Sequence, residues 1–306
     1  MNNTISGGTF IKSKPKIEIV FEMETPVVLS NPREDNEGNM YACSHSGEVL
    51  KFSDDGEVST FFTLGGIPND VAFTQNDIYF ADISNGVIYE KKNGQNDIIV
   101  LLKSYEGSPM KGPSSIVANK TDNFLIFCDS GYFGTTSLNT PNGSVFHIDL
   151  NNNIVNPILL NCLAHPSDIV YDEHSGVFYI AETFRNRIIR VTQNPIGIFH
   201  SSVFHTFNGR IGPTALAIDE LGNIYVSRYE YQNEEGKKDG IISIINKEGV
   251  EVGEITIEGR SEINGMFIPQ NKKKANVLYF TDKNFSGVMK VKLSQIANEN
   301  VDKTQS

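Results

Sequence analysis

One short apolar motif recurs along the whole chain. Each copy begins with aromatic or aliphatic residues, continues with a small residue in most copies and ends on a polar or charged one. The copies follow one another at intervals of ~40 to 55 residues, the length of one blade in a β-propeller. The copies are Met40–Ser44, Ile78–Asp82, Leu125–Asp129, Phe178–Glu182, Ile224–Arg228 and Leu278–Asp282. The repeat therefore predicts a ring of six similar sheets.

Other segments supply the remaining strands of each repeat. After each copy comes a stretch in which apolar and polar residues alternate, as in Gly47–Phe52 and Asn186–Val191, and this period predicts a half-buried antiparallel strand. Before most copies comes an apolar stretch headed by a turn residue, and turns such as Asp35–Asn39 join it to the motif. Outer strands are expected at residues 58–64, 98–102, 154–160, 202–207 and 250–257.

The last repeat has no outer strand of its own, because the chain turns polar after Leu293. The segment Lys16–Glu22 reads as a strand but belongs to no repeat, so we predict that it pairs into the last blade and closes the ring. The prediction is an all-β fold, a six-bladed β-propeller of four-stranded antiparallel blades over residues 16–294, with a flexible N-terminal segment (1–15) and a polar C-terminal tail (295–306). A parallel α/β barrel is the alternative, but no stretch has the apolar period of the helices that it needs.

The charge of the chain narrows the choice of partners. A net charge of −11 and a pI near 5.1 argue against nucleic acid, which needs a basic face. No apolar stretch reaches the ~18 residues of a membrane helix, and the N-terminus lacks the apolar core of a signal peptide. Cys43, Cys128 and Cys162 lie in apolar strands and are predicted to be buried free thiols. We therefore expect a cytoplasmic protein with no nucleic-acid or membrane partner.

The heads of the inner strands are expected to gather at one mouth of the central channel. The residues placed there are Asn31, Asn69, Asp70, Ser114, Ser115, His165, Ser167, Asp168, Thr214, Glu262 and Asn264. A calcium site needs about six to eight oxygen ligands, including carboxylates, and this set is poor in carboxylates. Asp70 and Asp168 could bind an ion only if both point into the channel, and strand alternation favours hydrogen bonds to backbone instead. His165, Asp168 and Glu262 are the candidate catalytic residues, although no Ser/His/Asp, phosphate-loop or zinc pattern accompanies them.

Two long loops are predicted to open on the same face, at residues 130–142 and 229–239. Long loops are uncommon without a role, and these carry Tyr132, Phe133, Tyr229 and Tyr231. The first could fold over a small ligand, and the second, which is charged, also suits a protein contact. The alternative is that both loops only cover the channel.

Several segments also carry a family resemblance. They are Phe127–Gly134, Asn142–Ile148, Tyr179–Ile188, Gly212–Asp219 and Gly222–Val226. Through them the stretch from 113 to 269 resembles the gluconolactonase and regucalcin (senescence-marker-protein) family, with the related lactonases and strictosidine-synthase-like propellers. The resemblance implies one divalent cation in the channel, held by a Glu of blade one, Asn residues heading blades three and four and an Asp heading blade five, which polarises a lactone carbonyl.

The ligand positions implied by the resemblance are altered in this chain. They fall at Ser30 or Asn31, Ser114, Ser167 and Thr214, so both carboxylates are replaced. Neutral hydroxyls do not offset the desolvation of a divalent ion, so we expect the metal site to be absent or very weak. The strictosidine-synthase type uses a Glu of blade six, for which Glu262 is the nearest candidate.

The first functional interpretation is a lactonase-like propeller with a degenerate metal site and no cofactor. Such a pseudoenzyme would be a binding or scaffold module for a protein partner, a larger assembly or a small ligand. The alternative is a metal-dependent hydrolase of a lactone or ester, with a divalent cation such as calcium at a rearranged site around Asp70, Asp168, His165 and Glu262. The two differ in whether those carboxylates converge on a bound ion. A third interpretation is structural packing within an assembly through the blade edges.

Overall fold

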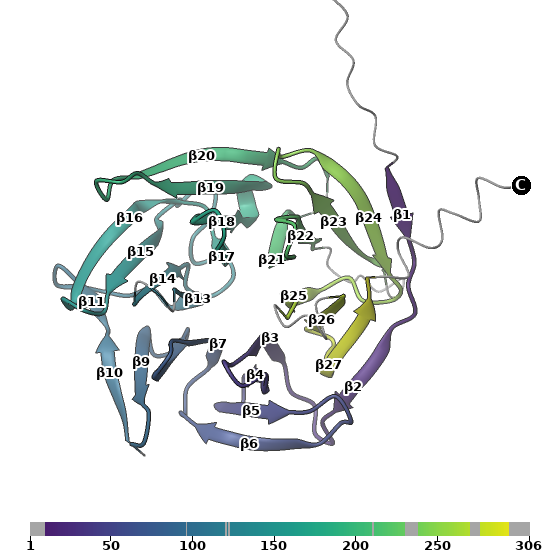
Figure 1. The fold of residues 1–306 in the computed structure, drawn as a ribbon, viewed down its shortest axis with the longest axis horizontal. Helices are drawn as coiled ribbons and strands as arrows, with labels where there is room; N and C mark the ends of the chain where they lie inside the picture. The colour runs from purple at the N-terminus through teal and green to yellow at the C-terminus, as the bar shows by residue number, and fades with distance from the viewer. Residues whose placement is uncertain are drawn as a thin grey trace, which may run out of the picture.

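The computed structural model describes residues 10–95, 97–119, 121, 123–209, 211–229, 238–269 and 276–293. Figure 1 shows their strands as sheets arranged around a central channel, so the predicted six-bladed β-propeller is confirmed. Blade 1 consists, from the channel outwards, of β3 (Leu29–Glu34), β4 (Met40–Ser44), β5 (Glu48–Phe52) and β6 (Val58–Thr63).

The later blades repeat this antiparallel order. Blade 2 consists of β7 (Pro68–Phe73), β8 (Asp77–Asp82), β9 (Val87–Lys92) and β10 (Ile98–Leu102), and blade 3 of β13 (Pro113–Asn119), β14 (Phe124–Asp129), β15 (Gly143–Asp149) and β16 (Ile154–Leu163). Blade 4 consists of β17 (Pro166–Asp172), β18 (Val177–Glu182), β19 (Arg187–Gln193) and β20 (Phe199–Thr206), and blade 5 of β21 (Pro213–Ile218), β22 (Ile224–Arg228), β23 (Gly240–Ile245) and β24 (Glu251–Ile257). Blade 6 begins with β25 (Ile263–Phe267), β26 (Val277–Asp282) and β27 (Phe285–Lys292). A small hairpin of β11 (Ser104–Tyr105) and β12 (Ser108–Pro109) joins blades 2 and 3.

The N-terminal part of the chain completes the last two blades. β2 (Glu18–Glu22) pairs antiparallel with β27 and becomes the fourth strand of blade 6, as predicted. β1 (Ile11–Ser13) adds to the edge of blade 5 by pairing parallel to β24. In Figure 1 both purple strands lie along the outside of the ring, beside the yellow and green strands of the last blades. β1 lies in the stretch that we predicted to be flexible. The sequence did not indicate this strand, because three residues are too few to show an apolar period.

Neighbouring blades pack through the apolar faces of their sheets. Tyr41 and Cys43 of blade 1 pack against Val71, Phe73 and Phe80 of blade 2, and the ring centroids of Tyr41 and Phe73 are 4.9 Å apart. The apolar residues of each motif copy thus supply both walls of a core between blades. Within the described ranges the chain forms no helix long and apolar enough to cross a membrane.

The cysteines follow this packing only in part. Cys43 and Cys128 are buried free thiols, as predicted. Cys162 is exposed, so the prediction was wrong for this residue. It lies on the outer strand β16, where residues 160–162 are all exposed because no further strand or blade covers them.

The acidic residue that ends most motif copies holds the loop that enters its blade. Asp129 Oδ1 accepts a hydrogen bond from Gly112 N at 2.9 Å, and Glu182 Oε1 accepts one from Ala164 N at 2.8 Å. Asp282 Oδ2 accepts one from the backbone N–H of residue 262 in the same way. These carboxylates therefore satisfy backbone donors of the loops that lead into the inner strands, which explains why the motif ends on an acid.

Candidate functional site

Six side chains at the heads of the inner strands form a closed ring of hydrogen bonds between blades. Each donates to a backbone carbonyl of the next blade, over distances of 2.5 to 3.4 Å. The donors, which we call the head ring, are Asn31, Asn69, Ser114, Ser167, Thr214 and Asn264. The ring closes because Asn264 Nδ2 of blade 6 donates to Leu29 O of blade 1 at 2.9 Å.

The head ring includes the positions at which the resemblance places metal ligands. Its members are neutral and are engaged as donors between blades. The side-chain oxygens Oδ1 of Asn31 and Asn264 are buried and have no hydrogen-bond partner among the described residues, but two amide oxygens fall far short of a calcium shell. No cluster of three or more His, Cys, Asp or Glu suited to a metal occurs within the described ranges. The head ring therefore does not fit a divalent cation.

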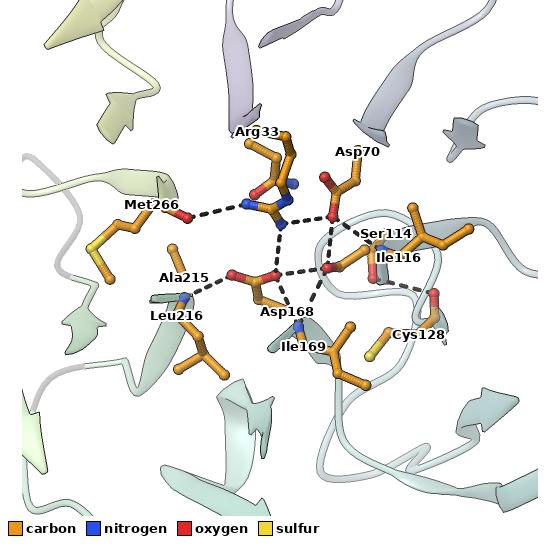
Figure 2. A network of polar contacts seen from close by, with 12 residues as sticks. Arg33, Asp70, Ser114, Ile116, Cys128, Asp168, Ile169, Ala215, Leu216 and Met266 are labelled. Atoms are coloured by element: carbon orange, nitrogen blue, oxygen red, sulfur yellow. Dashed lines mark hydrogen bonds and ion pairs between the residues drawn. The ribbon is translucent and has the colours of Figure 1, made fainter. Parts of the chain in front are cut away.

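The channel is closed one layer below the head ring by four polar residues, which we call the channel plug: Arg33, Asp70, Ser115 and Asp168. Figure 2 shows Arg33 between the two carboxylates. Arg33 Nη2 lies 2.8 Å from Asp70 Oδ2 and 3.6 Å from Asp168 Oδ1. Ser115 Oγ bridges the same two oxygens at 2.8 and 2.7 Å. Two of the predicted carboxylates, Asp70 and Asp168, thus converge, but on an arginine of the chain itself.

Backbone N–H groups fix both carboxylates of the plug. Asp70 accepts from Val71 N and from the inner strand of blade 3, and Asp168 accepts from Ile169 N at 2.8 Å and Leu216 N at 2.7 Å. The expectation that they hydrogen-bond to backbone is confirmed. Burial raises the pKa of Asp168 to about 6 and also raises the pKa of Asp70, although Arg33 opposes both shifts. Burial alone would lower the pKa of Arg33, but the charges of Asp70 and Asp168 raise it overall.

Above the plug lies a cavity of about 210 Å³, which we call the upper cavity. Five members of the head ring line it, all except Asn31. Aromatic residues of the two long loops, Tyr132, Phe133 and Tyr229, form part of its wall. Its cation is Lys283, whose Nζ lies 5.3 Å from the ring centroid of Phe133 and 5.1 Å from that of Tyr229. Burial lowers the pKa of Lys283, against the opposing charges of Glu262 and Asp282.

Two histidines face the same cavity, His45 and His165. Burial lowers the pKa of His165 to about 4, and the charge of Lys283 lowers it further in the same direction. The pKa of His45 is lowered by the same two causes. Nδ1 of His165 is buried and has no hydrogen-bond partner among the described residues. Both rings are therefore neutral at pH 7 and able to accept a proton.

The three candidate catalytic residues do not come together. His165 lines the upper cavity, Asp168 belongs to the plug, and Glu262 accepts a hydrogen bond from the hydroxyl of Tyr229 at 2.7 Å. Asp70, predicted at the mouth, also lies in the plug. Tyr231 lies outside the described residues.

Sequence reasoning missed Lys283, His45 and Arg33. A signal for the first two was present: the residue that directly follows a motif copy lines the upper cavity in five of six blades. Those residues are His45, Ile83, Ser130, Tyr229 and Lys283. Extending the repeat by one position would have found both. Arg33 carries no such signal, since an arginine after a proline reads as an exposed residue.

No family model matches the chain. Among curated relatives, lactonase drp35 of Staphylococcus aureus (strain USA300) is 27% identical over 146 residues, and that of Staphylococcus haemolyticus (strain JCSC1435) is 25% identical over 146 residues. Each match covers 45% of this chain and 42% of the relative, so it spans less than half the length of these relatives.

Solved structures match over more of the chain. A gluconolactonase of Xanthomonas campestris gives a TM-score of 0.72 at 12% identity, covering 91% of this chain and 89% of that one. A protein described as a putative gluconolactonase gives 0.71 at 15% identity, covering 92% and 93%. A chain of a nidogen–laminin complex gives 0.57 at 15% identity, covering 82% and 97%. The predicted resemblance to lactonase and gluconolactonase propellers is confirmed, and at these identities the structural likeness shows the fold alone.

Proposed function

We propose, from the likeness of this chain to lactonase and gluconolactonase propellers, that it binds and hydrolyses a small lactone or ester in the upper cavity. In this proposal Lys283 carries the positive charge that a divalent cation carries in the family that the sequence resembles. The observation that supports it is the position of the Lys283 ammonium in the cavity at the strand heads, against Phe133 and Tyr229.

Lys283 would act on the carbonyl oxygen of the substrate. Negative charge develops on that oxygen as water attacks the carbonyl carbon, and a fixed cation in a site shielded from water stabilises it. The two aromatic rings and the buried wall hold the ammonium in place, so little reorganisation is needed when the charge develops. The hydroxyl and amide groups of the head ring that line the cavity can hydrogen-bond to the rest of the substrate.

His165 would handle the proton. Its neutral ring accepts a proton from the attacking water as the new C–O bond forms, and returns it to the leaving alkoxide oxygen as the ring or ester C–O bond breaks. The products are a hydroxy acid, or an acid and an alcohol, and no oxidant or reductant is required. Because the head ring does not fit a divalent cation, no step involves a metal.

A second candidate is ligand binding without turnover, our first interpretation from the sequence. It is supported by the low basicity of His165. With a pKa of about 4 the ring is a weak base, and its Nδ1 has no orienting partner among the described residues. A protein partner at the face with the long loops also remains a prediction.

Hydrolysis of glucono-δ-lactone and of an aryl ester, measured with calcium or manganese and with EDTA, tests the proposal. We expect turnover that EDTA does not change, and a kcat/KM roughly 10²- to 10³-fold lower in Lys283→Met, since one group that stabilises the oxyanion is lost. Lys247→Met, an exposed lysine in a turn of blade 5, is the matched control and should behave as wild type.

The other outcomes are decisive. Turnover that depends on added calcium and survives Lys283→Met would support the metal-dependent hydrolase. Binding of the lactone by calorimetry without turnover would support the second candidate. Neither binding nor turnover would reject both.

A further inference from the structure

A second cavity lies at the opposite end of the channel, below the plug. This lower cavity has a volume of about 470 Å³, in the range of small-molecule sites. The C-terminal ends of the inner strands form its wall, which is largely apolar, with Phe73, Val170, Ile218 and Phe267 among its residues. Covering apolar surface of this kind with a hydrocarbon group is favourable, because both surfaces are removed from water.

The rim of the lower cavity is acidic. Six carboxylate residues line it: Glu34, Asp35, Asp172, Glu173, Asp219 and Glu220. Among the described residues, Arg33 is the only lysine or arginine in the same lining. It is already paired with Asp70 and Asp168. The field at this mouth is therefore negative, and the low-dielectric wall focuses it.

The acids of the rim are spread over three blades and do not converge on one point. No cluster suited to a metal occurs among them within the described residues. A cation held here must therefore be stabilised by the summed field of the rim and by contact with the apolar wall. An inorganic ion has no apolar surface with which to make that contact.

We propose that the lower cavity binds a small organic cation, an amine or quaternary ammonium with an apolar body. The body lies against the apolar wall, and the charged group points outwards, because the six carboxylates lie at the rim. This site is independent of the upper cavity and of the hydrolase proposal, and its ligand has the opposite charge preference.

Three probes of equal body and different charge test the proposal: 4-phenylbutylamine, 4-phenylbutan-1-ol and 4-phenylbutyrate, by calorimetry at low and high salt. We expect the amine to bind at least about 10-fold more tightly than the alcohol, and the acid to bind most weakly, with the preference for the amine reduced by salt. Equal affinities for amine and alcohol would overturn the charge argument. No binding of any probe would overturn the site.

Variants place the bound amine. Glu173→Gln with Glu220→Gln removes two exposed rim charges and should weaken amine binding several-fold, whereas Glu248→Gln, an exposed residue outside the lining, should not. Ala118→Phe, which fills part of the cavity, should weaken amine and alcohol alike, with a thermal melt to check the fold. Amine affinity that falls in Lys283→Met, or that none of these lining variants changes, would place the ligand elsewhere. Binding of a lysine-rich peptide but not of the amine would overturn the small-ligand assignment.

Discussion

Replacing Arg33 with methionine should destabilise the protein strongly, because it removes the cation from the channel plug. Arg33 Nη2 contacts Asp70 at 2.8 Å, and Nη1 donates to the carbonyls of Pro32 and Met266 at 3.1 Å. The Asp70 side chain is fully buried. Breaking a buried ion pair by removing one partner typically costs about 3–5 kcal/mol, since a buried charge is left without compensation.

Protonation sets a limit to this loss. Without Arg33, Asp70 can stay buried as a neutral acid, and at pH 7 protonating it costs about 1.4 kcal/mol for each pH unit above its unfolded pKa of about 3.9, or about 4 kcal/mol. At pH 5 the same step costs about 1.5 kcal/mol. The loss of stability in Arg33→Met should therefore be about 3–4 kcal/mol at pH 7 and shrink to less than half of that at pH 5.

Urea unfolding at the two pH values measures this difference directly. Adding Asp70→Asn to Arg33→Met should recover part of the loss at pH 7, because the carboxylate in direct contact with Arg33 is then removed, while Asp168 keeps its two backbone donors. Lys292→Met, which breaks an exposed pair with Glu18 at 3.5 Å, is the control and should cost less than about 1 kcal/mol. A loss in Arg33→Met that is below about 1 kcal/mol, or that is the same at pH 5 and pH 7, would refute the reasoning.

Three further perturbations follow from single contacts. The pKa of Asp168 is about 6 in the folded protein and about 3.9 when unfolded, so the free energy of unfolding should fall by up to about 3 kcal/mol as the pH rises through this interval. Urea midpoints of Asp168→Asn should not show this fall with pH. A Cβ on Gly240 would lie 2.0 Å from Arg260 O, so Gly240→Ala should lower stability by about 1–3 kcal/mol in thermal melts; a loss within error would contradict the close approach. Phe21→Ala on β2 removes a buried ring 5.2 Å from Phe52 and should cost about 3–5 kcal/mol; a cost below about 1 kcal/mol would show that β2 does not close the ring.

The fold was predictable because each blade repeats the same apolar period. A strand of a propeller is packed between two neighbouring sheets, so its buried positions recur at every copy of the motif. Ring closure by β2 followed from counting, since one blade lacked an outer strand and one strand lacked a blade. β1 could not be found in this way, because its pairing is a short backbone contact on an edge that almost any sequence can make.

The depth of each side chain in the channel was not predictable from alternation. Every inner strand has an irregular pairing near its head, such as the shift between Pro68 and Asp70 in β7. As a result Asn69 lines the upper cavity while the next residue, Asp70, enters the plug. Simple alternation would place two consecutive residues on opposite faces. A bulge leaves no mark in a single sequence, so the separation of cavity from plug needed the structure.

The same layering bears on how the two cavities relate. Three inner strands, β7, β13 and β17, each contribute residues to the upper cavity, the plug and the lower cavity, so the three layers differ in chemistry while sharing these strands. The plug lies between the cavities, and in it Arg33 is paired with two buried carboxylates. Moving Arg33 would cost the free energy of breaking its buried pair with Asp70, so coupling between the two ends through Arg33 is expensive. Independent binding at the two ends would mean that the plug is part of the rigid core. Coupled binding would mean that the plug rearranges when either ligand binds.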